Sequence, residues 1–316
     1  MVNLVRNELM KIFRRPGTFV MIGILIILTS VVGGIVKYNQ NHEDVKVNEN
    51  WKQTYQAEIK SSEKQIQKSN NSQQKEFLKN DIALKEYRIK HNLSPNENYN
   101  VWSFVNDASS LISTAGLFTI IIAAGIVASE FNWGTIKLLL IRPINRGKIL
   151  ASKYISIILF ALLLLIVLYT YSSILGVILF GTPDTAAPYL NYLDGKITEQ
   201  TMALHLIISY GLKSINMIML ATAAFMISTV FRNSSLATGL SIALMFTGSS
   251  ITFLLASKFD WAKYILFANT DLTQYFEGTP MVEGMTLTFS IIMLAIYFAI
   301  FQFFAFFVFK KRDVAA

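Results

Sequence analysis

The amino-acid sequence predicts an all-α polytopic membrane protein that crosses the bilayer six times. The 316-residue chain is 53% hydrophobic and only 15% charged. A soluble domain of this length could not keep so many apolar residues off its surface. Its apolar residues gather in six runs that can each cross about 30 Å of hydrocarbon, which takes about 20 helical residues. Because these runs are continuously apolar rather than alternating, helices rather than a closed β-barrel must satisfy the backbone in lipid.

Residues 1–17 predict an amphipathic helix that lies in the plane of the lipid headgroups. Its apolar side chains recur on one helical face, its basic side chains fall largely off that face, and Pro16 and Gly17 end the pattern. Its charged residues include Arg6, Glu8, Lys11 and Arg14. The alternative is a basic flank that only fixes the topology.

The six spans follow in chain order. We place them at residues 18–36, 108–129, 154–180, 209–231, 236–256 and 285–309. The first is too long for a signal peptide and lacks a small-residue cleavage site, so we expect it to remain as a helix. The connecting segments are 37–107, 130–153, 181–208 and 257–284, with a tail at 310–316.

The distribution of charge predicts the orientation. The N-terminus, the 130–153 segment, the 231–235 turn and the tail carry 13 basic and 3 acidic residues, whereas the short loops of the opposite side, counted with Lys37 and Lys213, carry 5 and 7. Residues 38–107 carry 10 of each. Since short basic loops stay in the cytoplasm, we expect both termini inside, and residues 38–107 and the loops 181–208 and 257–284 outside. The net charge of +8 therefore reflects topology, and no nucleic-acid-binding motif accompanies it.

The outer segment 37–107 predicts a polar helical hairpin. Apolar residues at helical spacing form one stripe that includes Trp51 and Ile59 and, after "SNNS", a second that includes Leu78 and Ile89. We interpret the hairpin as a spacer or packing element, with a substrate-gating or partner-binding cap as the alternative. Its low apolar content also leaves partial disorder open.

The segment 130–153 is too polar to cross a bilayer and too apolar for a simple solvated loop. Glu130 ends the second span, Gly134 allows a turn, and "IKLLLIRP" supplies about two helical turns before Pro143 stops them. A short amphipathic helix on the membrane surface can dock into a groove of a cytoplasmic protein. It can equally serve as an interfacial anchor.

This segment resembles the signature of type-2 (ABC-2) permeases of ATP-binding-cassette exporters, E-x-x-x-G-T-x-x-x-L-L-x-x-P-x-x-R-x-x-x-x-x-x-K. The matching residues are Glu130, Gly134, Thr135, Leu139, Leu140, Pro143, Arg146 and Lys153. The N-terminal "NELMKIFRRPGTF", the six spans and the large first outer loop are similar too. The resemblance implies that the segment is a coupling helix, which contacts a separate ATPase subunit and transmits its closure to the spans.

The same resemblance implies individual roles. Glu130 would brace the coupling helix, Gly134 and Thr135 would set its entry, and Pro143 its exit. The residues expected to face the ATPase or lipid phosphates are Arg142, Arg146 and Lys153. The implied complex is a dimer of identical or different permeases with two ATPase copies in a bacterial plasma membrane. The stretch "FANTDLTQYF" resembles the segment before the last span in permeases linked to bacitracin-like or lantibiotic-like peptide resistance.

Motifs for catalysis and metal binding are absent from the sequence. It has no cysteine and only three scattered histidines, and it lacks G-x-x-x-x-G-K-[ST], H-E-x-x-H and G-x-S-x-G. We therefore expect no enzymatic activity, no metal and no cofactor in this chain. ATP and Mg²⁺ would bind to the partner ATPase.

The outer half of the chain holds the candidate substrate-path residues. Lys213 lies in the fourth span, and Asn216 follows it by about one helical turn. At 1.5 Å per residue, Lys213 lies about 27 Å along the helix from Phe231. At that depth a lysine can snorkel to the interface, and a substrate cavity or charge pair is the alternative. Phe276 belongs to the aromatic-rich 257–284 loop, which predicts short interfacial helices in an aromatic belt or a gate.

The sequence thus predicts the permease subunit of an exporter. The expected cargo is amphipathic or hydrophobic, such as an antimicrobial peptide, a lipid-like molecule or a drug. A non-transporting sensor or immunity protein that captures a peptide on its outer hairpin is the rival. A secondary carrier is disfavoured because the spans contain no pair of carboxylates.

Overall fold

The computed structural model describes residues 1–42, 50–69, 71–94, 99–135, 144–183, 188–193 and 196–311. Six stretches of helix in these ranges are long and apolar enough to cross a membrane, which confirms the predicted multi-pass helical architecture. They are α2 (Pro16–His42), α5 (Val101–Ala108) continued through η1 (Ser109–Leu111) into α6 (Ile112–Asn132), α8 (Arg146–Phe180), α9 (Met202–Phe231), α10 (Ser234–Ala256) and α13 (Leu287–Lys311).

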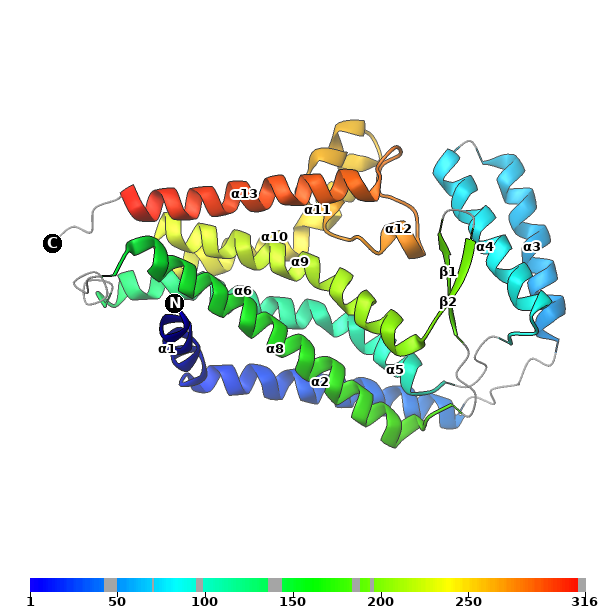
Figure 1. Ribbon diagram of the computed structural model, residues 1–316, viewed down its shortest axis with the longest axis horizontal. Coiled ribbons are helices and arrows are strands. Elements are labelled where there is room, and N and C mark those ends of the chain that lie inside the picture. Colours follow the sequence, from blue (N-terminus) through cyan, green and yellow to red (C-terminus); the bar gives the residue numbers. More distant parts are fainter. Residues whose placement is uncertain are drawn as a thin grey trace.

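The remaining elements lie at the two ends of this bundle (Figure 1). One end holds α1 (Val2–Phe13) and the last turns of α13, and we call it the terminal end. The opposite end, the hairpin end, holds α3 (Trp51–Lys68), α4 (Ser72–Lys90) and a two-stranded sheet. Short helices connect α10 to α13, namely η2 (Asp260–Tyr264), α11 (Leu266–Asn269) and α12 (Gln274–Glu277).

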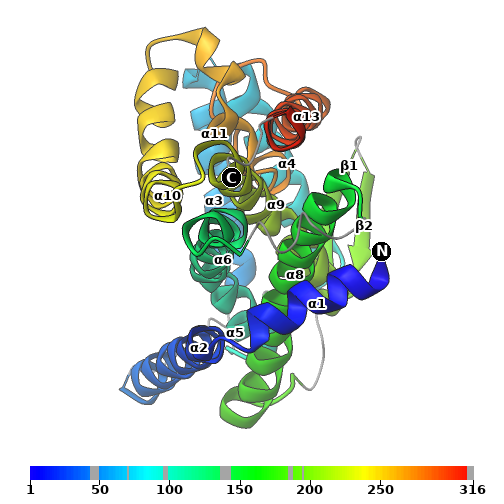
Figure 2. The same cartoon turned by 90° about the vertical axis from the view of Figure 1, so that its left-hand side faces the viewer.

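Helices α6 and α9 pack along their length at the centre of the bundle (Figures 1 and 2). Small side chains let the two backbones approach, and Ser228 joins them directly. Its Oγ donates to the carbonyl of Ala124 at 2.6 Å and accepts from the amide of Ala128 at 3.1 Å. The centre of the fold is therefore held by close packing and by a hydrogen bond that water cannot replace in lipid.

Helices α2, α10 and α13 lie at the periphery and expose large apolar side chains. Examples are Ile27 on α2, Phe253 on α10 and Phe303 on α13, each at least 60% exposed. Such surfaces suit contact with lipid tails, which are as apolar as the side chains themselves.

The two helices predicted within residues 37–107 form an antiparallel hairpin. Lys85 of α4 stabilises it with its Nζ 2.9 Å from Glu58 of α3 and 2.8 Å from Asp81 of α4. The hairpin also contacts the rest of the hairpin end, since Tyr87 donates to Glu199 at 3.3 Å and Ser72 donates to Glu283 at 3.1 Å. It is thus attached to the bundle by side-chain contacts as well as by its chain connections.

A short β-hairpin was not predicted. Residues 181–208, expected as a loop, contain β1 (Tyr189–Leu193) and β2 (Lys196–Gln200), which pair antiparallel from Tyr189 opposite Gln200 to Leu193 opposite Lys196. The signal in the sequence is "DG" between two runs that contain tyrosine, isoleucine and threonine, a frequent two-residue hairpin turn.

Three segments predicted as connections are helical. Helix α9 begins at Met202, α8 begins at Arg146, and α5 lies inside the bundle, where Phe104 and Val105 are fully buried. Each span is therefore longer than the hydrophobic run from which it was predicted. These extra turns are more polar than the runs, but packing on neighbouring helices stabilises them as helix. The length of an apolar run does not reveal that packing.

Candidate functional site

Four charged side chains meet at the terminal end, and we call them the four-charge cluster: Glu8, Lys11, Glu130 and Lys153. Lys153 Nζ lies 2.8 Å from Glu8 Oε2 and 2.7 Å from Glu130 Oε1. Lys11 Nζ lies 2.7 Å from Glu8 Oε1 and 2.9 Å from Glu130 Oε1. Each carboxylate therefore contacts both ammonium groups, and acid and base alternate around a closed ring.

The cluster joins three helices that are distant in sequence. Glu8 and Lys11 lie one turn apart on α1, Glu130 lies in the last turn of α6, and Lys153 lies in the second turn of α8. In Figure 2, α1 crosses the beginning of α8, and the hydroxyl of Ser156 donates to the carbonyl of Val5 there. The interfacial helix predicted at residues 1–17 is thus fixed to the bundle through its charged as well as its apolar side chains.

The predicted exposure of Lys153 to an ATPase or to lipid phosphates is wrong. Its side chain is 0% exposed, and the residues next to it in the cluster, Glu8 and Glu130, are 5% and 6% exposed. The reason is that α8 already begins at Arg146, so Lys153 follows the buried Ile149 and Leu150 on the inward face of that helix.

Burial and pairing act in opposite directions on the two α1 residues of the cluster. Burial would raise the pKa of the Glu8 carboxyl, but the ammonium groups of Lys153 and Lys11 outweigh it and hold that pKa below its ordinary value. Burial would lower the pKa of the Lys11 ammonium, but hydrogen bonding to Glu8 and the charge of Glu130 raise it above its ordinary value. Both shifts favour the charged forms.

These shifts predict that α1 docks over a broad range of pH. The contribution of Glu8 to the stability of this docking is present above its unfolded pKa of 4.5. It is lost as the pH falls through its lower folded pKa. The contribution of Lys11 is present below its unfolded pKa of 10.5 and is lost as the pH rises through its higher folded pKa. A spin label at Val2→Cys, unique because the chain has no cysteine, should therefore be immobile at neutral pH and gain mobility only at a pH below the ordinary carboxyl pKa of 4.5.

The matched control for this titration is Glu8→Gln, in which the label should be mobile already at neutral pH. A label that is as immobile in Glu8→Gln as in the original chain at neutral pH would contradict the role assigned to Glu8.

The other predicted coupling residues lie on both sides of residues 136–143. At one side Gly134 has a positive φ of 69°, a conformation that favours glycine, and the hydroxyl of Thr135 donates to the carbonyl of Glu130 at 3.4 Å. At the other side Arg146 begins α8 behind Asn145, which caps the helix by accepting from the amide of Gly147 at 2.8 Å. Four predicted residues fall outside the described ones, namely Leu139, Leu140, Arg142 and Pro143, and so does the short coupling helix predicted over "IKLLLIRP".

The remaining charges predicted on the interfacial helix, Arg6 and Arg14, are exposed and take no part in the four-charge cluster. The pairing of Glu8 and Lys11 with Glu130 and Lys153 was missed from the sequence. A signal was present, because Glu8 and Glu130 are two of only three acidic residues on the strongly basic side.

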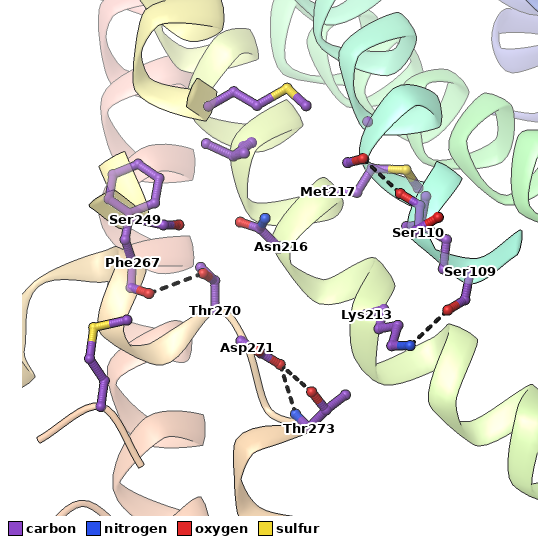
Figure 3. A pocket seen from close by; sticks show the side chains of 16 residues that line it. Ser109, Ser110, Lys213, Asn216, Met217, Ser249, Phe267, Thr270, Asp271 and Thr273 are labelled. Carbon is purple, nitrogen blue, oxygen red and sulfur yellow. Dashed lines mark hydrogen bonds between the residues drawn. The ribbon is translucent and has the colours of Figure 1, made fainter. Parts of the chain in front are cut away.

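A second candidate site, the Lys213 cavity, lies toward the hairpin end and measures about 340 Å³. It is open on one side and is lined by the beginning of α6 with η1, by α9, by α10 and by the segment from Phe267 to Met281 (Figure 3). Lys213 and Asn216 both line it, as the substrate-path hypothesis requires. Phe276 does not, and instead lines a neighbouring cavity that shares Thr273 with the first.

The side chain of Lys213 donates to the hydroxyl of Ser109 at 2.7 Å. It thus lines a cavity between helices, the arrangement expected from the second of the two interpretations that the sequence left open. Among the described residues, no three His, Asp or Glu side chains are grouped to hold a metal ion.

The fold and these sites define a multi-pass α-helical membrane protein with a buried ionic cluster at one end and a polar cavity toward the other. The chain belongs to a family described as "Protein of unknown function (DUF2705)", whose profile matches residues 74–315. It is 53% identical over 318 residues, covering all of both chains, to "Uncharacterized protein YhcI" of Bacillus subtilis (strain 168). It is 33% identical to "Uncharacterized membrane protein YdbK" of the same organism, over 74% of this chain and 90% of that one.

Proposed function

We propose that this chain is the permease subunit of an ATP-driven ABC exporter in a bacterial plasma membrane, with both termini in the cytoplasm. The ATPase is a separate subunit present in two copies, and a second permease, identical or different, completes the membrane pathway. The cargo is amphipathic or hydrophobic.

The four-charge cluster is the observation that carries this proposal. It ties α1, α6 and α8 together at the two ends of the segment that resembles a coupling helix. A push on that segment would therefore reach two membrane spans and the interfacial helix at once. Networks of hydrogen bonds and ion pairs between rigid helices can carry such coupling between distant sites.

The proposal is tested with Gly134→Val, which disfavours the left-handed turn at the entry to the segment without touching the cluster. Coupling changes from single substitutions are typically 0.5–2 kcal/mol, so we expect cargo-stimulated ATP hydrolysis to fall by about 2- to 30-fold. The measurement uses the permease co-purified with its ATPase and reconstituted in vesicles.

Arg146→Ala in the predicted contact should lower retention of the ATPase, and Lys148→Ala is the matched control, because Lys148 is exposed and lies on the same turn of α8. Unchanged ATPase retention and unchanged coupled hydrolysis in both Gly134→Val and Arg146→Ala would count decisively against a coupling role.

The attachment of the α3–α4 hairpin supports a second candidate, a sensor or immunity protein. A peptide held by the hairpin would act on Glu199, just before α9, and on Glu283, just before α13, through the contacts of Tyr87 and Ser72. A protein with this function would co-purify with a histidine kinase or another signalling partner rather than with an ATPase. The same co-purification experiment therefore distinguishes the sensor from the exporter.

A further inference from the structure

The Lys213 cavity has a polar end and an apolar end. Ser109, Lys213 and Asp271 line it toward the hairpin end. Deeper along α6 and α9 the lining is more apolar, with Ile112 on α6 and Met217 and Leu220 on α9, although Ser113 lines it there too. A ligand that satisfies both ends has a polar headgroup and a hydrocarbon part.

The polar end holds one positive and one negative side chain on separate walls. The ammonium of Lys213 uses one hydrogen bond on Ser109 and is suited to bind an anionic group with the others. Across the cavity, Asp271 is held in place because its Oδ1 accepts from the amide of Thr273 at 3.0 Å and from its hydroxyl at 2.6 Å. Figure 3 shows the two charged residues at the same end of the cavity. Such an arrangement complements a headgroup with both charges.

Asn216 lies between these charges and the apolar part of α9. Its Oδ1 is buried and has no hydrogen-bond partner among the described residues. Buried acceptors of this kind are ordinarily paired, and Asn216 lines the cavity. An N–H or O–H group of a bound headgroup would supply the missing donor.

We propose that the Lys213 cavity binds a zwitterionic single-chain amphiphile. Its phosphate or carboxylate contacts Lys213, its ammonium lies beside Asp271 and within reach of Asn216, and its chain begins along Ile112 and Met217. The volume of about 340 Å³ is at the small end of ligand sites and suits a headgroup with the first part of one chain. The inference rests on the proposed function only in treating this ligand as cargo.

The test measures binding to the purified protein alone, in dodecyl maltoside and without ATPase or nucleotide. Lauroyl-lysophosphatidylethanolamine has both charges, lauroyl-lysophosphatidylglycerol lacks the ammonium, monolaurin lacks both, and phosphoethanolamine lacks the chain. We expect the first to bind most tightly, with a loss of about tenfold for each missing charge and no measurable binding of phosphoethanolamine. Titration by native mass spectrometry gives the dissociation constants.

Substitutions then assign the contacts. Lys213→Met should weaken binding of the two lauroyl probes that carry a phosphate by about tenfold or more. Lys213→Arg should retain their binding, which would show that the site still folds. Asp271→Asn should weaken only the ethanolamine probe. Lys258→Met is the matched control, because Lys258 is exposed just after α10 and does not line the cavity.

Equal affinity of the three lauroyl probes, or unchanged binding by Lys213→Met, would overturn the proposal. If the preference for the ethanolamine probe survives Asp271→Asn, the proposed contact between Asp271 and the ammonium is wrong. Strong binding of phosphoethanolamine, which has no chain, would show that the ligand need not be an amphiphile. These outcomes are independent of the coupling test, since they are read without an ATPase. A failed binding test with intact coupling rejects this ligand class and not the permease.

Discussion

Replacing Lys153 with Met should destabilise the protein by about 3–5 kcal/mol, because removing one partner leaves buried charge uncompensated. The ammonium of Lys153 is fully buried and contacts both Glu8 and Glu130. After the substitution only Lys11 would face the two carboxylates, and its side chain is 40% exposed. Methionine keeps the length and apolar stem of lysine, so the loss reports the charge.

Unfolding by heat or by a denaturing detergent, followed in micelles, measures this effect. The matched control is Lys148→Met, which removes an exposed lysine from the same helix and should change stability by less than about 0.5 kcal/mol. Equal stability of the two variants would show that the cluster does not hold the terminal end together.

The membrane architecture was predictable because a long apolar run has few structural solutions. Once charge is excluded from about 20 consecutive residues, a spanning helix is the only way to satisfy the backbone. The amphipathic pattern of residues 1–17 likewise sufficed to place α1 (Val2–Phe13). Both predictions use information that lies within a single segment of the chain.

The four-charge cluster was not predictable in the same way. Its contacts join Lys11 to Glu130 across 119 residues and Glu8 to Lys153 across 145, which depends on how the helices are packed. The direction of Lys153 further depends on where α8 begins, because each residue turns the side chain by about 100° around a helix. With residues 146–153 interpreted as a connection, nothing placed this ammonium on the inner face.

The Lys213 cavity shows an intermediate case. The sequence singled out Lys213 and Asn216 because a charge and an amide interrupt an apolar run, and the structure brings both to one cavity. Asp271 was missed as a member of this site because it comes from a loop 58 positions further along the chain. Its place opposite α9 follows from the fold of the segment between α10 and α13.

Exchanging the charges of Glu130 and Lys153 should not restore stability. In an isolated ion pair, the double variant Glu130→Lys/Lys153→Glu would keep the attraction. In the closed ring, the lysine placed at 130 would face Lys11, and the glutamate placed at 153 would face Glu8. We therefore expect the double variant to be at least as unstable as Lys153→Met, by about 3–5 kcal/mol relative to the original chain.

Exchanging all four charges restores the alternation and provides the control. Glu8→Lys/Lys11→Glu/Glu130→Lys/Lys153→Glu should regain most of the stability that the double variant loses, because every contact is again between opposite charges. If the double variant itself recovers stability, the cluster acts as a single ion pair and not as a ring. If neither variant recovers stability, the local geometry of the side chains matters more than the alternation of charge.

The fully exchanged chain also separates bracing from recognition. If the cluster only holds α1, α6 and α8 together, restored stability should bring back cargo-stimulated ATP hydrolysis, because the same three helices are joined with the same rigidity. If hydrolysis stays uncoupled in a chain of restored stability, the sign of the charges at the base of the 131–145 segment must itself matter to the ATPase. Measuring stability and coupled hydrolysis on the same four-residue variant decides between these two roles of the four-charge cluster.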